Sequence, residues 1–383
     1  MKTLAGSSMN RYGLVRELMR KGVDIVNLDA GRPSFDTPLH IKEASKAALD
    51  QGVVHYGDLQ GSLRLREALV KKLKNYNKID VESNEVLITN GLTQASFSSL
   101  MAYLNEGDEV ILFEPFYPQH IKKIELLGGK PVPVILKHED GYKFDPKEVK
   151  RKITSKTRII VLVNPVNPTG RVFSYEEISA LADITIKNDL LLITDEVYEY
   201  TLYDGHKHIS IASLPEMRER TISLYGFTKT YAMDGWRLGY VVAKDEILDN
   251  IKKIALQETA HPNVFAQDGA VAATEGPQDC VREMVSEYNR RRELLCKRLN
   301  AIPNISCKKP EGAMYAFSDF TAMNKSSNEI ADELLKEAKV ATNPGILFGP
   351  SCEGFLRLCF ASTSYERIEE AMNRIESHIK HSK

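Results

Sequence analysis

The sequence predicts an α/β protein, in which helices cover both faces of a mostly parallel β-sheet, joined to a smaller α+β domain. The first observation is that short runs rich in β-branched residues alternate with amphipathic segments between about residues 85 and 245. The second is that the pattern changes near residue 277 to one long helix followed by short strands and more helices. We therefore expect a large domain over residues 41–276 and a small domain built from residues 1–40 and 277–383.

Six apolar runs are predicted as buried strands of the sheet: residues 85–89, 108–113, 158–163, 190–194, 221–225 and 238–243. Helical patterns separate most of these runs, as at residues 93–104 and 174–188. In the second domain, residues 280–302 form a long helical pattern with an apolar stripe, and the last pattern, at 365–379, is also helical. The lysine-rich run at 70–78 is predicted as a solvated helix face without a function of its own.

The composition is that of a globular protein with almost balanced charge. Hydrophobic residues make up 43% of the 383 positions, charged residues make up 27%, and the formal net charge is −1. A nucleic acid or an anionic membrane is therefore not expected as a partner. No apolar run approaches the length of a membrane span and the N-terminus shows no signal peptide, so we expect a cytoplasmic protein. The odd number of cysteines without a CxxC spacing predicts reduced thiols at Cys280, Cys296, Cys307, Cys352 and Cys359.

Polar and aromatic side chains follow five of the predicted strands. Because ligands of an open parallel sheet bind beyond the carboxyl ends of its strands, these residues are expected to surround one site. They are, in chain order, a glycine turn that enters a helix (90–95), Tyr117 in a proline-bounded turn, Asn167 in a rigid loop, Asp195 with Tyr198, and Lys229. The helix N-terminus offers backbone N–H groups to an anion such as phosphate.

Pyridoxal phosphate requires this combination of groups. Its phosphate needs N–H donors and an arginine, its ring needs an aromatic partner, its ring nitrogen needs a carboxylate, and its aldehyde needs a lysine amine. Each residue also has a structural alternative: Asp195 could cap a helix, Tyr117 could belong to the core, and Asn167 could stabilise a turn. Their joint occurrence in this order favours the cofactor site. Lys229, in a small, apolar, turn-rich stretch, is then an amine nucleophile rather than a solvated surface lysine.

Three stretches carry a resemblance to a known family: NPVNPTG (164–170), TDEVYEY (194–200) and FTKTYAMDGWRLGY (227–240). They resemble the signature stretches of the class I aminotransferases, which are pyridoxal-phosphate enzymes of fold type I. The similarity extends from LDAGRPSFDTP (28–38) to FLRLCFA (355–361). The resemblance implies a seven-stranded, mostly parallel sheet between helices, pyridoxal 5′-phosphate as the cofactor, and a homodimer with shared active sites.

The resemblance also implies a role for each residue of the site. Lys229 forms the Schiff base with the cofactor and transfers protons, Asp195 contacts the ring nitrogen, and Tyr198 completes the catalytic set. The further cofactor contacts that it implies are Leu92, Thr93 and Arg237 at the phosphate, Thr228 beside the lysine, Tyr117 on the ring, Asn167 and Tyr198 at the phenolic oxygen, and Tyr56, which reaches the phosphate of the neighbouring subunit. The substrate contacts that it implies are Arg357, Gly31 and Asn167 around the α-carboxylate.

The sequence departs from the family pattern around the expected substrate side chain. Gly226 stands three residues before Lys229, where some members have a phosphate-binding serine, and Asp234 stands where threonine is common. Asp29 replaces a small residue, and Arg32 replaces an acidic or neutral one. A carboxylate of Asp29 in the substrate side-chain pocket would favour a cationic or donor-rich substrate. Alternatively, Asp29 pairs with Arg32 or with another cation of the protein.

We predict an aminotransferase that moves an amino group between an L-amino acid and a 2-oxo acid. A second hypothesis is an elimination and cyclisation enzyme that uses the same cofactor residues on a hydroxylated basic amino acid such as hydroxyarginine. A third is a binding or regulatory protein that has lost the chemistry, and the presence of all the cofactor residues argues against it. The sequence contains no dinucleotide-binding or P-loop motif. No metal site is expected, because His206 and His208 are predicted as surface residues without a carboxylate nearby.

Overall fold

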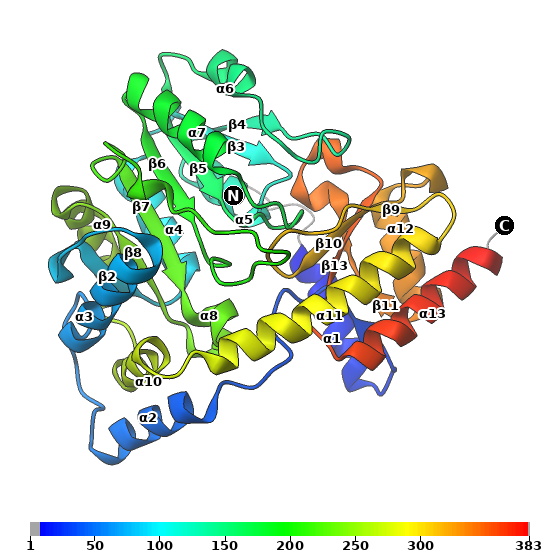
Figure 1. The fold of residues 1–383 in the computed structure, drawn as a ribbon, viewed down its shortest axis with the longest axis horizontal. Helices are drawn as coiled ribbons and strands as arrows, with labels where there is room; N and C mark the ends of the chain where they lie inside the picture. The colour runs from blue at the N-terminus through cyan, green and yellow to red at the C-terminus, as the bar shows by residue number, and fades with distance from the viewer. Residues whose placement is uncertain (1–7, 382–383) are drawn as a thin grey trace.

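The computed structural model describes residues 8–381, whose arrangement is shown in Figure 1. Residues 1–7 and 382–383 lie outside the described residues. They include the first residues of the N-terminus, where no signal peptide is predicted, and both ends of the predicted small domain. Seven strands form the main sheet, in the order β2-β8-β7-β6-β5-β3-β4. They are β2 (Val86–Thr89), β3 (Glu109–Glu114), β4 (Lys130–Ile135), β5 (Thr157–Val163), β6 (Leu191–Asp195), β7 (Thr221–Gly226) and β8 (Gly239–Val242). Only β8 runs antiparallel to its neighbours, which confirms the mostly parallel sheet.

Strand β4 is the one strand of this sheet that the apolar runs do not predict. Its sequence, KPVPVI, contains Pro131 and Pro133, which have no N–H group to donate to a neighbouring strand. The strand lies at the edge of the sheet and pairs in parallel with β3 alone. An edge strand needs hydrogen bonds on one side only, so the prolines are tolerated there.

Helices cover both faces of the sheet, because successive residues of a buried strand point to opposite faces. In β3, Val110 and Leu112 join the apolar cluster of α4, α5 and α9, whereas Ile111 and Phe113 join the cluster of α6 and α7. Helices α2, α3 and α10 pack over the β2 and β8 end of the sheet. The bounds are α1 (Ser8–Arg20), α2 (Leu39–Asp50), α3 (Leu63–Lys72), α4 (Leu92–Tyr103), α5 (Pro118–Leu126), α6 (Pro146–Lys152), α7 (Tyr175–Lys187), α8 (Phe227–Thr230), α9 (Asp245–Glu258) and α10 (Val264–Glu275).

The C-terminal part of the chain forms a second, smaller set of elements around its own core. The two predicted helices are present as α11 (Asp279–Ala301) and α13 (Tyr365–His381), with the short α12 (Ser327–Glu333) between them. A four-stranded antiparallel sheet has the order β12-β13-β10-β9. Its strands are β9 (Ser306–Cys307), β10 (Tyr315–Asp319), β12 (Asn343–Pro344) and β13 (Phe355–Cys359).

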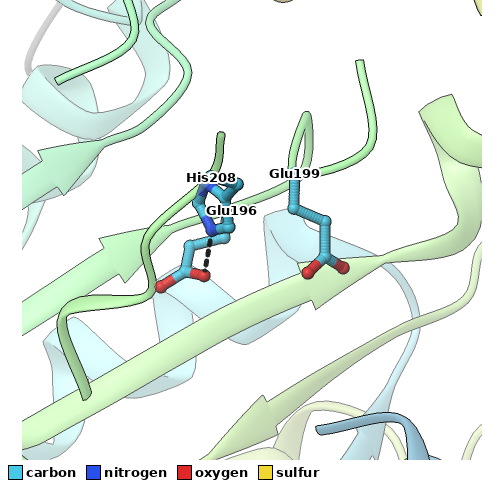
Figure 2. Close-up of side chains that lie close together, drawn as sticks. All are labelled: Glu196, Glu199 and His208. Carbon is cyan, nitrogen blue, oxygen red and sulfur yellow. Dashed lines mark hydrogen bonds and ion pairs between the residues drawn. The ribbon is translucent and has the colours of Figure 1, made fainter. Parts of the chain in front are cut away.

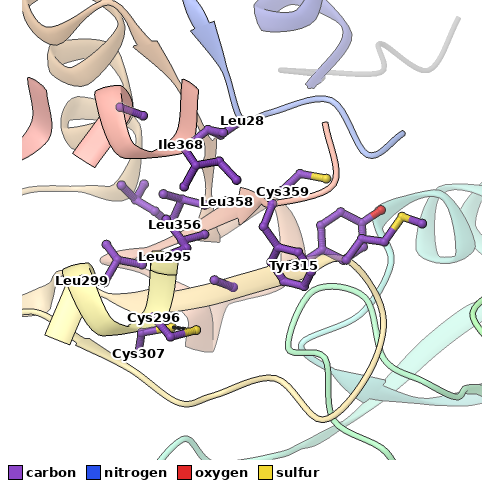
Figure 3. Packing of buried hydrophobic residues seen from close by; sticks show 14 of the residues in the cluster. Leu28, Leu295, Cys296, Leu299, Cys307, Tyr315, Leu356, Leu358, Cys359 and Ile368 are labelled. Carbon is purple, nitrogen blue, oxygen red and sulfur yellow. Dashed lines mark hydrogen bonds between the residues drawn. The ribbon is translucent and has the colours of Figure 1, made fainter. Parts of the chain in front are cut away.

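The N-terminal segment packs against this C-terminal part. Strand β1 (Val26–Asn27) pairs in parallel with β11 (Val340–Ala341), so chain segments more than 300 residues apart lie side by side. Figure 3 shows Leu28, just after β1, in one apolar cluster with Leu295 of α11, Leu358 of β13 and Ile368 of α13. Among residues 8–381, no helix is both long and apolar enough to cross a membrane.

Candidate active site

A cavity of about 660 Å³ opens beyond the carboxyl ends of the parallel strands. Twelve of the thirteen predicted site residues line it: Asp29, Gly31, Leu92, Thr93, Tyr117, Asn167, Asp195, Tyr198, Thr228, Lys229, Arg237 and Arg357. The remaining one, Tyr56, is 90% exposed on the surface of this chain. The cavity therefore brings together groups from the ends of the parallel strands with Asp29, Gly31 and Arg357 from the two ends of the chain.

Lys229 lies in the short helix α8, directly after β7. Its side chain keeps a partly exposed surface toward the cavity and is otherwise enclosed by protein, and Nζ donates a hydrogen bond to the carbonyl oxygen of Gly31. Loss of solvent lowers the pKa of the Lys229 amine to about 8. An amine with this pKa is deprotonated in part near neutral pH, so it can act both as a nucleophile and as a base.

Asp195 ends β6 and is held by two partners. One carboxylate oxygen accepts a hydrogen bond from the backbone N–H of Val197 at 3.2 Å, and the other lies 3.3 Å from Nε2 of His120. His120 lies three positions after Tyr117, so both lie on one face of the chain entering α5, and both line the cavity. Sequence reasoning overlooked His120, and this helical spacing after Tyr117 was the available signal.

Tyr198 lies three positions after Asp195, and its phenol contacts a second phenol. Its hydroxyl lies 2.7 Å from the hydroxyl of Tyr315 in β10, and burial raises the pKa of Tyr198 well above its usual range. Both phenols therefore stay protonated and can donate hydrogen bonds. Tyr315 comes from the C-terminal part of the chain, and no motif around residue 315 predicted that it reaches the site.

Arg357 of β13 presents a buried guanidinium to the cavity. It donates to the carbonyl oxygen of Asp29 at 2.7 Å and to Oδ1 of Asn167 at 3.1 Å, and its carbon lies 4.3 Å from the centre of the Tyr315 ring. Its Nε has no hydrogen-bond partner within residues 8–381. Among the described residues no carboxylate forms an ion pair with this arginine, so a carboxylate ligand would supply the missing charge.

A glycine turn and an arginine form an anion cradle at the start of α4. Gly91 has a φ of +82° and precedes Leu92, the first residue of the helix. A Cβ at Gly91 would lie 2.6 Å from Nη2 of Arg237, so only glycine lets the guanidinium approach the helix N-terminus. Arg237 in turn donates to the carbonyl oxygen of Asp234 at 3.0 Å. The turn, the helix N-terminus and the arginine suit a phosphate group.

The glycine at position 226 has a packing explanation. A Cβ at Gly226 would lie 2.2 Å from Cδ1 of Leu92, so the leucine fills the space that a serine side chain would need. The cradle of this chain therefore offers backbone N–H groups and Arg237, without a serine hydroxyl at position 226.

Asp29 is a buried acidic group in the wall of the cavity. The residue is 5% exposed, and its Oδ1 has no hydrogen-bond partner in the part of the chain that the structure describes. Burial raises the pKa of Asp29 to about 6, although the charges of Arg357 and Arg11 oppose this effect. Among the described residues no ion pair joins Asp29 to Arg32, which is exposed, or to another cation. Asp29 therefore forms no ion pair with Arg32, whereas Arg357 and Arg11 act on its carboxyl through their charges.

A second polar cluster includes Glu196, the residue that follows Asp195. Figure 2 shows Glu196, Glu199 and His208, whose potential metal-binding atoms all lie within 4.8 Å of one another. Nε2 of His208 lies 2.6 Å from Glu196, and the ammonium of Lys72 lies 2.5 Å from Glu199. Lys72 already places a cation beside these carboxylates, so the cluster is an internal charge network that anchors the turn after β6.

This cluster corrects two sequence predictions. His208 is buried against a carboxylate, so the expectation of a surface histidine is wrong, whereas His206 is exposed. The run 70–78 is not a uniformly solvated helix face, because Lys72 is largely buried and Asn77 donates to Glu199 at 2.7 Å. Both errors have one cause: the partners of these polar side chains come from distant segments.

Comparison with known proteins identifies the family. The profile described as aminotransferase class I and II matches residues 23–375. The chain belongs to this family. An aspartate aminotransferase of Pyrococcus abyssi is 41% identical over 94% of this chain and 93% of its own, and the aromatic-amino-acid aminotransferase 2 of Thermococcus litoralis is 40% identical over 95% and 94%. The crystal structure of an aspartate aminotransferase mutant of Thermus thermophilus superposes with a TM-score of 0.93, at 35% identity over 98% of each chain.

The protein is therefore a pyridoxal-phosphate-dependent aminotransferase of fold type I, as the sequence predicted. The residues around the cavity fit this cofactor. The aminotransferase offers an anion cradle at Gly91, a carboxylate at Asp195 and an amine at Lys229 in one cavity.

Proposed function

We propose that this aminotransferase holds pyridoxal phosphate between the cradle at the start of α4 and the end of β6. One observation carries the proposal: the amine of Lys229 and the carboxylate of Asp195 face the same cavity as the cradle. Leu92, Thr93 and Arg237 would bind the phosphate. The further contacts in this proposal are Thr228 beside the lysine, Tyr117 against the ring, Asn167 and Tyr198 at the phenolic oxygen, and Asp195 at the ring nitrogen. The bound cofactor supplies a ring that accepts electrons from the substrate Cα.

Lys229 is the proposed acid and base of the reaction. Its Nζ accepts the proton from the substrate Cα and later donates it, and its lowered pKa suits this task near neutral pH. The hydrogen bond to the Gly31 carbonyl orients the amine within the cavity. The carboxyl group of Asp195, which contacts His120, would lie at the ring nitrogen and accept its proton in a hydrogen bond.

Arg357, Asn167 and Gly31 are proposed to bind the substrate α-carboxylate. The guanidinium of Arg357 is 7% exposed and has only neutral partners, the carbonyl of Asp29 and the amide of Asn167. A planar carboxylate can accept two parallel hydrogen bonds from such a group. This places the substrate with its Cα toward Lys229.

The substrate is proposed to be an amino acid with a basic or donor-rich side chain. The buried carboxylate of Asp29, without an ion-pair partner among residues 8–381, supports this choice. A cationic side chain would provide the missing charge, whereas the second carboxylate of aspartate would meet like charge. Asp29 thus belongs to the proposed substrate-binding residues.

The aminotransferase is further proposed to act as a cytoplasmic homodimer with shared active sites. Supporting this, an unusual number of exposed large apolar side chains fall within residues 39–63: Leu39, Leu49, Val53, Val54, Tyr56, Leu59 and Leu63. Such an apolar patch is typical of an interaction surface. Arg237 is also exposed in the single chain, and Tyr56 of a second subunit would reach the phosphate beside it.

The division of the chain into a large domain, 41–276, and a small domain, 1–40 with 277–383, also remains a proposal. The pairing of β1 with β11 and the separate apolar cluster of α11, β13 and α13 support it. The substrate cavity would then lie where the two domains meet, since Arg357 comes from one and Lys229 from the other.

The holoenzyme mixed with single amino acids and no 2-oxo acid tests the reaction type. A transaminase should convert its visible absorbance to that of the aminated cofactor in one turnover and release one equivalent of 2-oxo acid. An elimination and cyclisation enzyme should instead turn over continuously and accumulate a cyclic or unsaturated product. Continuous product release with a hydroxylated basic amino acid would favour the second hypothesis over transamination as the main activity.

A further inference from the structure

Two adjacent lysines of α5 have opposite environments. Lys122 is exposed and forms a surface ion pair with Glu125 at 3.4 Å. Lys123 is 8% exposed and lines the cavity that contains Lys229. A lysine with so little exposure is unusual, because its charge loses most of its hydration. The KK pair in the sequence gives no sign of this difference.

The ammonium of Lys123 has a neutral hydrogen-bond partner. Its Nζ donates to Oγ of Ser96, which in turn donates to the carbonyl oxygen of Leu92 at 2.8 Å. Among the described residues no ion pair links Lys123 to a carboxylate. Burial lowers the pKa of Lys123 to about 8, and the charge of Asp195 is the largest effect opposing it. The hydrogen bonds therefore connect Lys123 to the helix turn that begins the anion cradle.

The charged groups around Lys123 come from three elements. Asp195 at the end of β6 acts on it most strongly, followed by Glu258 of α9, which accepts a hydrogen bond from Ser98 at 2.8 Å. On its own helix, His120 lies one turn earlier and contacts Asp195 directly. Helix α5 thus presents an imidazole and an ammonium toward the same carboxylate, one in contact and one further away.

We propose that Lys123 is a positioning residue of the cofactor site: a buried cation that acts through Asp195 and weakens proton binding at the ring nitrogen and at the nitrogen of Lys229. The proposal rests on the proposed role of Asp195 at the ring nitrogen. A buried cation beside a cavity disfavours further positive charge there, because little solvent screens it. Lys123 therefore counteracts part of the negative potential of Asp195. Arg237 and Arg357, which line the same cavity, act in the same direction.

Spectroscopic titration of the holoenzyme tests this proposal. The visible absorbance of the bound cofactor is followed against pH in the wild type, in Lys123→Met and in Lys122→Met. Lys123→Met should raise the apparent pKa of the absorbance change by roughly one unit, the effect of one buried charge at an effective dielectric constant of about 20. Lys122→Met removes the same charge from the exposed neighbour and should leave the titration unchanged.

Two further variants separate charge from packing. Lys123→Gln retains a donor for Ser96 without the charge and should shift the titration like Lys123→Met. Lys123→Arg retains the charge and should titrate like the wild type. A wild-type titration in Lys123→Met or Lys123→Gln, or an equal shift in Lys123→Arg, overturns the proposal.

A double variant tests whether the effect passes through Asp195. In an Asp195→Asn background, Lys123→Met should produce a clearly smaller shift than in the wild type, because the two charges are coupled. An equal shift in both backgrounds overturns the coupling. If Asp195→Asn alone leaves absorbance and turnover unchanged, the assignment of Asp195 itself fails. An unchanged Lys123→Met titration with an impaired Asp195→Asn enzyme rejects only the inference about Lys123.

Discussion

Replacing Asp29 by asparagine removes the carboxylate that is proposed to select the substrate side chain while keeping the volume of the residue. Burial raises the pKa of Asp29 from 3.8 to about 6. At about 1.4 kcal/mol per pKa unit, this shift of roughly two units means that ionising the carboxyl in the cavity costs ~3 kcal/mol. A cationic substrate side chain that pairs with Asp29 offsets this cost, so Asp29→Asn should lower kcat/KM for a basic amino acid by roughly 100-fold.

The assay compares kcat/KM for arginine-like, acidic and aromatic amino acids in the wild type, in Asp29→Asn and in a matched control. Asp36→Asn is suitable as the control, because Asp36 belongs to the same segment but is exposed and pairs with Lys42 at 2.5 Å. Only Asp29→Asn should change the ratio between basic and other substrates. In the wild type, KM for a basic amino acid should rise as the pH falls below about 6, because the raised pKa makes Asp29 neutral there.

Equal losses for all substrate classes in Asp29→Asn would refute this reasoning. So would a wild-type preference for aspartate or phenylalanine that the variant leaves intact. In either case the role of Asp29 would be to hold the segment around Arg357 through its backbone carbonyl, which accepts hydrogen bonds from Arg357 and from Asn343 at 2.7 Å each.

Three other variants test the remaining assignments. Lys229→Ala should abolish turnover without changing the far-ultraviolet circular dichroism. Borohydride reduction of the wild type should attach the cofactor to Lys229, and a label on another lysine would contradict the assignment. Asp195→Asn should still bind cofactor but lose several orders of magnitude in kcat, and near-normal turnover would assign its role to another residue. Tyr56→Phe should weaken cofactor binding in the dimer, and mixing it with Lys229→Ala should restore activity through hybrid sites if subunits exchange. A monomer that turns over at the wild-type rate would contradict the shared site.

The sequence by itself determined the main sheet and most of the candidate site. Six strands of the sheet were predicted because strands buried on both faces are continuous apolar runs, a property that local sequence records directly. The residues at their ends, such as Tyr117, Asp195 and Lys229, could then be assigned to one site because the carboxyl ends of parallel strands meet at one edge. Strand β4 was not predicted, because its prolines are compatible with a strand only at the edge of a sheet. Which strand lies at the edge depends on the arrangement of the whole sheet.

Only the tertiary structure decided the environment of the charged side chains. Lys122 and Lys123 are neighbours of the same type, yet α4 and the end of β6 enclose one and solvent surrounds the other. His208, expected at the surface, lies against the buried Glu196 (Figure 2). Lys72, also expected at the surface, pairs with Glu199 beside it. A local pattern specifies which face of a helix or strand is apolar. The charge state of a polar group depends instead on its desolvation and on its partners from distant segments, which only the folded structure brings together.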